Sequence, residues 1–219
     1  MPRQPYLKVV SQPRGSQIDV GTKSIGQRPA LEALIAQCLM TWTHVEAEMA
    51  LVLGQLLGAQ TAVAFAVFQS LRQSRTQREV ISAAGKAALN EADQKLLTVI
   101  LSVHSSLEKE RNNIAHGHFG TSTKVMDGIL WMHTNSYLEI RASITLAETP
   151  QWDDAKHQEL LSSIWIYKIE DLIKIVDDMK SLAVVWYDFI AYLRSAVGSQ
   201  ERADKYRELC GRLHITQQI

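Results

Sequence analysis

The sequence has few residues of the kinds that build cross-linked or membrane-spanning proteins. Among its 219 residues there are two cysteines, Cys38 and Cys210. Two distant cysteines are too few for a disulfide framework or a cysteine-based metal cluster, and we expect core thiols in a reducing compartment. No run approaches the roughly 18 apolar residues of a membrane span, and the N-terminus lacks the apolar segment of a secretory signal. We therefore expect a cytoplasmic protein with no membrane partner.

An excess of charge is also lacking, because 23 basic residues balance 23 acidic ones. Binding to a nucleic acid would therefore depend on a local basic patch and not on the field of the whole protein. The sequence has no glycine-rich phosphate loop, no G-x-S-x-G element and no dinucleotide-binding fingerprint, so we expect no cofactor. The length and the 46% hydrophobic content are typical of one globular domain with appendages.

Proline is scarce after the first part of the chain. Four of the five prolines lie at or before Pro29, and five of the six charged residues within 1–28 are basic. Three glycines in the same range interrupt any apolar periodicity. This composition predicts a flexible basic tail over 1–28. A basic arm that contacts RNA or DNA is the alternative.

Beyond Pro29 the apolar residues recur at three- and four-residue steps, which is typical of helices. A two-residue alternation appears only near residues 124–144, where Thr134-Asn135-Ser136 forms a turn signal between segments rich in β-forming residues. We predict a mostly α fold: a helical bundle over 29–198 with a β-hairpin insertion over about 124–144, and then a C-terminal helix and tail over 199–219. The helices are expected over about 29–57, 61–73, 75–89, 90–116, 166–197 and 200–213.

The stretch "ERNNIAHGHFG", residues 110–120, places unusual chemistry at a predicted helix end. Arg111, Asn112 and His116 lie in the last six residues of the helix, before Gly117 as a natural C-cap, and His118 follows. Cations at a helix C-terminus are favoured by the helix dipole, so an ordinary basic end is one interpretation. Asn112 and His116 share a face, whereas Arg111 lies about 140° around the axis from His116.

An arginine beside a histidine is also suited to cleaving RNA. A guanidinium holds two phosphate oxygens in fork geometry and stays charged. An imidazole titrating near neutral pH can remove the proton of a ribose 2′-hydroxyl or protonate the leaving 5′-oxygen. The 2′-oxygen then attacks the phosphorus, and this reaction can proceed without a metal.

The segment "ERNNIAHG" resembles the R-x4-6-H signature of the HEPN superfamily (higher eukaryotes and prokaryotes nucleotide-binding domains). The segment "WTHVEAEMA" begins at Trp42 and contains Glu46. It is similar to the Trp-x3-Glu segment of bacterial relatives. The resemblance extends over about 30–195. It implies a helical domain that dimerises and acts as a metal-independent endoribonuclease, often as a toxin or an antiviral effector. A non-catalytic module that binds a nucleotide, RNA or a protein partner is the alternative.

The resemblance also implies roles for individual residues. His116 would be the general acid and base, Arg111 the phosphate clamp and Asn112 the residue that positions them. Glu46 and His118 would be supporting residues. Toxins paired with nucleotidyltransferase antitoxins have a tyrosine where His118 stands here, so that kind of antitoxin is not expected. An antitoxin or defence-system partner of another kind stays open.

Two further sets of residues could bind a ligand. Arg72, Arg75 and Arg78 lie at three-residue spacing, either as a solvated helix face or as a contact to an RNA backbone. His116 and His118 alone make half of a metal site at most, and no cysteine or aspartate near them in the sequence completes a tetrahedral set, so we predict no metal.

Overall fold

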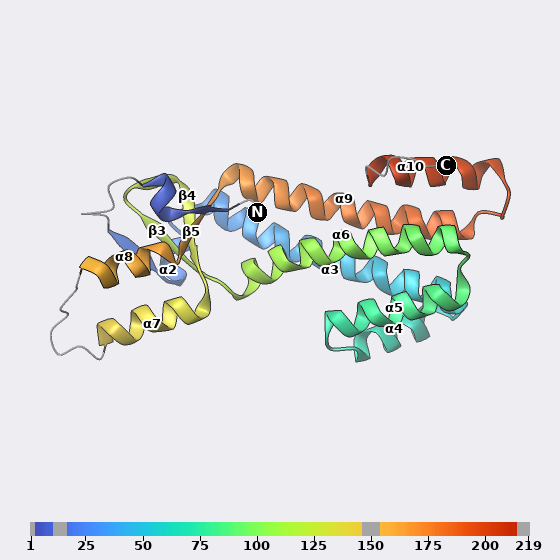
Figure 1. Cartoon of the computed structure of the whole chain (residues 1–219), viewed down its shortest axis with the longest axis horizontal. Helices are drawn as coiled ribbons and strands as arrows, with labels where there is room; N and C mark the ends of the chain where they lie inside the picture. The colour runs from blue at the N-terminus through green and yellow to red at the C-terminus, as the bar shows by residue number, and fades with distance from the viewer. Residues whose placement is uncertain (1–2, 11–16, 146–153, 214–219) are drawn as a thin grey trace. The chain divides into compact units, whose positions relative to one another are not determined.

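The computed structural model describes residues 3–10, 17–145 and 154–213, and over these residues the chain is mostly helical with a small antiparallel sheet (Figure 1). The fold divides into two compact units. Unit 1 comprises Met1–Leu39 and Lys109–Asp177, and unit 2 comprises Met40–Glu108 and Asp178–Ile219. Each of the three long helices has a part in both units. Their apolar periodicity runs on without a break, so the sequence pattern does not indicate this division.

The predicted helices are confirmed to within a few residues. The three long ones are α3 (Pro29–Leu57), α6 (Glu91–His116) and α9 (Ile169–Arg194), and the shorter ones α4 (Thr61–Ser70), α5 (Ser74–Ala88) and α10 (Gln200–Arg212). Polar side chains cap the starts of two of these helices. The Asn90 side chain accepts a hydrogen bond from the Asp93 amide at 3.0 Å, and Ser199 accepts one from the Arg202 amide at 3.1 Å.

The core of unit 2 consists of the apolar stripes of α3, α6 and α9. Trp42 and Trp186 are among the largest fully buried side chains, and His104 of α6 lies between them, 1% exposed. The His104 ring centroid is 4.8 Å from that of Trp42 and 6.3 Å from that of Trp186. This histidine therefore belongs to the core, where the helical spacing of α6 predicts it.

A buried polar network attaches α10 to the start of α6. Asp93 is 2% exposed and accepts hydrogen bonds from the Tyr192 hydroxyl, the Asn90 amide nitrogen and Arg202 Nη2, the last at 2.6 Å. Arg202 Nη1 also donates to the backbone carbonyls of Tyr192 and Ser195. Buried charges are tolerated when they are paired and hydrogen-bonded in this way.

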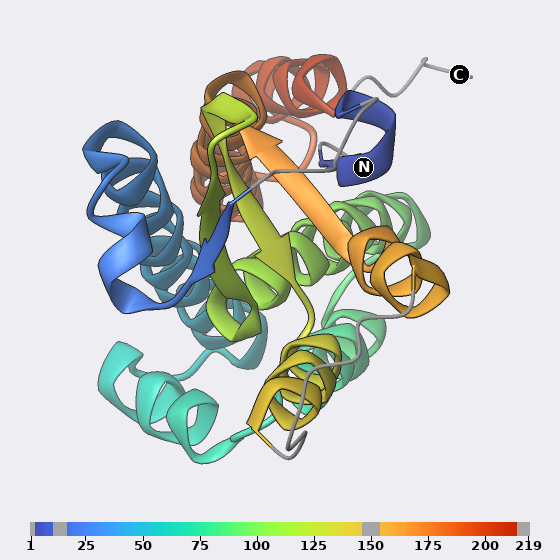
Figure 2. The same ribbon diagram turned by 90° about the vertical axis from the view of Figure 1, so that its left-hand side faces the viewer.

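Unit 1 contains a five-stranded antiparallel sheet in the order β1-β5-β4-β3-β2. Figure 2 shows its longer strands side by side. A buried cluster packs on the sheet and includes Tyr6, Leu130, Met132 and Ile166. The strands are β1 (Gln4–Pro5), β2 (Ile18–Val20), β3 (His118–Ser122), β4 (Val125–Met132) and β5 (Ile164–Lys168).

The predicted flexible tail over 1–28 is wrong for the residues that the structure describes there. They form β1, α1 (Tyr6–Val9), β2 and α2 (Thr22–Ile25), and Tyr6 is fully buried with its hydroxyl 3.1 Å from Ser122 Oγ. Composition misled the prediction because an edge strand tolerates proline, and β1 with Pro5 lies at the edge of the sheet. Residues 1–2 and 11–16 of the predicted tail lie outside the described residues.

The predicted hairpin exists but is misplaced. It consists of β3 and β4, whose turn lies between the paired residues Ser122 and Val125, and not of segments flanking Thr134. Thr134-Asn135-Ser136 instead begins α7 (Thr134–Thr145), because threonine and asparagine are favoured at helix starts as well as in turns. Helix α8 (Asp154–Ser162) and β5 were not predicted, and the first residues of the expected helix at 166 belong to β5.

Within the described ranges, no individual helix has both the length and the apolar character needed to cross a bilayer. Helices α3 and α4 satisfy those criteria only when taken together, and the chain bends by 119° between them.

Candidate active site at the end of helix α6

Side chains from β4 and α7 hold the last turn of α6. A helix end leaves its last carbonyls without partners inside the helix. Here Trp131 Nε1 donates to the Asn113 carbonyl at 2.8 Å, and Thr134 Oγ1 donates to the His116 carbonyl at 2.8 Å. The Gly117 amide also donates to Asn113, at 3.0 Å. The helix end is therefore fixed to the sheet and to the start of α7.

Gly117 is required for space and not for its backbone conformation. The predicted C-cap commonly has a left-handed backbone, but Gly117 is not one of the glycines with positive φ. A Cβ placed on Gly117 would lie 1.7 Å from Trp131 Nε1. The indole that holds the helix end therefore occupies the volume of the missing side chain.

A hydrogen bond connects Arg111 and Asn112, two of the three predicted catalytic residues. Arg111 Nη1 donates a hydrogen bond to Asn112 Oδ1 at 2.9 Å, and both side chains are half-buried. His116, the last residue of α6, is exposed. His116 lies five positions after Arg111 on the helix, so their Cα atoms differ by about 140° around the axis. The arrangement combines a guanidinium oriented by an amide with an imidazole open to solvent.

His118 stacks on Tyr137, a residue that no pattern in the sequence marks as functional. Their ring centroids are 4.0 Å apart with an angle of 12° between the planes, and both side chains are half-buried. His118 begins β3, and Tyr137 lies in the first turn of α7. Tyr137 could not be identified from sequence, because the misplaced hairpin assigned it to a strand.

A cation–π contact supports the tryptophan that holds the helix end. The guanidinium carbon of Arg3 lies 4.1 Å from the centre of the Trp131 ring, and Arg3 Nη1 donates to the Tyr167 hydroxyl at 3.1 Å. Burial raises the pKa of the Tyr167 phenol to about 12, although the nearby Arg3 favours the ionised form. The sequence assigned Arg3 to a tail, and no pattern connects it to Trp131 before the sheet forms.

Glu46 lies in unit 2, whereas Arg111 and His116 lie in unit 1. Its Oε1 accepts a hydrogen bond from Trp42 Nε1 at 2.8 Å. The two residues lie four positions apart on α3, so this carboxylate has a tryptophan partner on the same face of the helix. The role of Glu46 as a supporting carboxylate stays a prediction.

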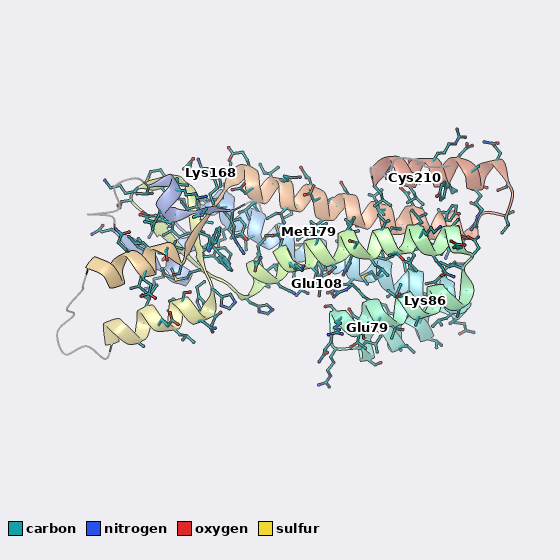
Figure 3. All side chains as sticks on the ribbon, viewed as in Figure 1. Glu79, Lys86, Glu108, Lys168, Met179 and Cys210 are labelled. Carbon is teal, nitrogen blue, oxygen red and sulfur yellow. The ribbon has the colours of Figure 1, made fainter. Side chains whose placement is uncertain are left out.

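The three arginines Arg72, Arg75 and Arg78 do not share one helix face, because Arg72 precedes α5. Arg78 forms an ion pair with Glu108 in which the side chains are 22% and 11% exposed. Arg75 pairs with Glu79 at 2.8 Å on the surface. Figure 3 labels both glutamates. Arg72 and Arg75 are exposed and Arg78 is half-buried, and the RNA contact of the three arginines stays a prediction.

In the part of the chain that the structure describes, no group of three or more histidine, cysteine, aspartate or glutamate side chains is arranged to hold a metal ion. His133 contacts Trp131 edge to face, with ring centroids 6.4 Å apart, and its Nδ1 accepts from the Asn135 amide at 3.4 Å. No family model, no curated protein and no solved structure matches this chain.

Proposed function

We propose that this protein is a metal-independent endoribonuclease of the HEPN type, which cleaves RNA through attack of the ribose 2′-hydroxyl. The observation that carries the proposal is the exposed imidazole of His116 at the end of α6, on the same helix as a guanidinium that Asn112 orients. The proposal includes a homodimer, an action as a toxin or in antiviral defence, and control by a partner protein.

The contrast with His104 supports a chemical role for His116. Both histidines belong to α6, but His104 is buried between two tryptophans, where it cannot reach a substrate. His116 is open to solvent, so a ribose hydroxyl can approach it within hydrogen-bonding distance. A histidine retained only for packing would be expected at a position like that of His104.

In the proposed reaction, His116 takes the proton of the 2′-hydroxyl while the 2′-oxygen attacks the phosphorus. His116 then returns this proton to the 5′-oxygen of the next nucleotide, which leaves as a hydroxyl, and a 2′,3′-cyclic phosphate forms. Arg111 stabilises the added negative charge on the phosphoryl oxygens, and its hydrogen bond to Asn112 keeps the guanidinium from being reoriented at each turnover.

The test uses purified full-length protein, single-stranded RNA and EDTA. We expect products with 2′,3′-cyclic phosphate ends, and His116→Ala should reduce the rate by about 100-fold or more. Arg111→Lys should also be slow, because a lysine keeps the charge but loses the fork geometry. The matched control is His44→Ala, which removes an exposed histidine of α3 and should leave the rate unchanged.

Cleavage by His116→Ala at the rate of the unchanged protein would refute the assignment. RNA binding without cleavage by the unchanged protein would instead favour a non-catalytic binding module.

A further inference from the structure

The stacked pair of His118 and Tyr137 is held rigidly beside the end of α6. His118 pairs with Met132 in the β3–β4 ladder, and the Tyr137 amide donates to the His133 carbonyl at 3.0 Å. Thr134 Oγ1 ties the start of α7 to the His116 carbonyl. Both rings of the pair are thus carried by elements that are fixed to the helix bearing His116.

The pair is less buried than three aromatic residues of unit 1, and it shares its half-buried state with Phe119 and Trp165. Tyr6 and Tyr167 are 0% exposed and Trp131 is 4% exposed, whereas His118 and Tyr137 are both half-buried. Tyr137 also packs against the buried cluster that contains Tyr6 and Met132. His118 is not among the residues of that cluster, and it is the member of the pair that lies two positions after the exposed His116 in the chain.

We propose that His118 and Tyr137 form a stacking platform for one nucleobase of the RNA, next to the scissile phosphate. This inference rests on the proposed function. Two residues span at most about 7 Å between Cα atoms, so His116 and His118 are near enough to serve one nucleotide. A base on the platform directs its ribose and phosphate toward the His116 imidazole.

The chemistry of the platform defines what it recognises. Every base has a π-face, so stacking accepts all four bases and requires only that the base be unstacked from its neighbours. His118 and Tyr137 act here as positioning residues, because they hold the nucleotide while His116 transfers the proton.

The test measures RNA affinity in the His116→Ala background, where cleavage does not interfere. The probes are short single-stranded RNAs, either intact or with one abasic nucleotide placed at each position in turn. At one position, loss of the base should weaken binding by about 5- to 100-fold, the effect of losing one base–aromatic stack. Tyr137→Leu should weaken binding of the intact RNA by a similar factor and abolish the difference between intact and abasic probes.

Three controls separate stacking from packing. Tyr137→Phe keeps the aromatic ring and should bind like the parent. Tyr187→Leu removes an exposed tyrosine of α9, 62% exposed, and should also bind like the parent. His118→Leu provides a second variant of the platform, to be used if Tyr137→Leu does not fold. The abasic series can be measured on the parent protein alone, so it tests the platform even if neither variant folds.

The inference is overturned if no abasic position weakens binding, or if Tyr137→Leu and His118→Leu retain the full difference between intact and abasic probes. Its failure is distinguishable from that of the proposed function. If the protein does not cut RNA but its binding depends on the base at one position, the enzyme assignment fails and the platform stands. If cleavage depends on His116 but no abasic position weakens binding, the platform fails and the enzyme assignment stands.

Discussion

The two ends of helix α6 use polar side chains in opposite ways. At its start, in unit 2, Asp93 is 2% exposed and is bonded to Asn90, Tyr192 and Arg202. At its other end, in unit 1, His116 is exposed and Arg111 is half-buried. One end is closed by a network of buried charges, and the other presents titratable groups to solvent.

The difference shows how charged residues can be divided between structure and chemistry. A buried carboxylate must be paired, because an isolated charge in the interior costs several kcal/mol, so Asp93 and its partners fix where α10 attaches. An exposed group at a helix end carries no such cost, and its removal changes stability little. Groups of the second kind are the ones that can serve a substrate without weakening the fold.

The largest expected effect is at the closed end. Asp93→Ala leaves Arg202 without its carboxylate partner, while the Arg202 side chain is only 12% exposed. We expect a loss of about 3 to 5 kcal/mol in the free energy of unfolding, measured in urea. Asp204→Ala is the control, because Asp204 pairs with Arg207 on the surface and should cost less than about 1 kcal/mol. Equal losses in the two variants would contradict the structural role of the network.

The two histidines of α6 provide a second comparison. His104→Ala removes a ring packed between Trp42 and Trp186 and should lower the free energy of unfolding by about 2 to 4 kcal/mol. His116→Ala should change it by less than about 1 kcal/mol, the size of a charge effect at a helix end. Thermal or urea unfolding of both variants measures this, and a large loss for His116→Ala would mean that its side chain is part of the fold.

A smaller effect is expected from two glycines that differ in the space around them. Gly117→Ala forces the indole of Trp131 to move and should cost about 1 to 3 kcal/mol. Around Gly211, inside α10, nothing beyond its chain neighbours and the helix's own backbone lies within 4 Å of the point where a Cβ would be, so Gly211→Ala should be neutral or stabilise the protein by up to about 1 kcal/mol. Urea unfolding of the two variants measures both effects, and a gain in stability from Gly117→Ala would show that Trp131 does not fill this volume.

Much of the helical part was predictable because its signals are local. A three- and four-residue periodicity requires only that one face of each helix be buried, and the bounds of α3, α6 and α10 follow from it. The capping role of Asn90 is equally local, since the bond spans three residues. Arg111 and its neighbour Asn112 are hydrogen-bonded, and the role of Asn112 as a positioning residue stays a prediction.

The sheet and the surroundings of the site were not predictable in the same way. Strand β1 pairs with β5, and Gln4 lies opposite Ile166, which is distant in the chain. Because this strand depends on a distant partner, the short segment around Pro5 has no local sequence pattern that predicts it. Thr134 and Asn135 are as suitable for a turn as for a helix start, and only the pairing of β3 with β4 decides between them. Tyr137 acquires its place beside His118 through that decision.

By itself the sequence determined the helices, the caps and the order of Arg111, Asn112 and His116 along one of them, because each depends on residues a few positions apart. Only the tertiary structure decided that His116 is exposed while His104 is buried, that Trp131 occupies the space beside Gly117, and that Arg3 belongs to the sheet. These features depend on contacts between segments distant in the chain, whose free energy appears only when the whole core is assembled.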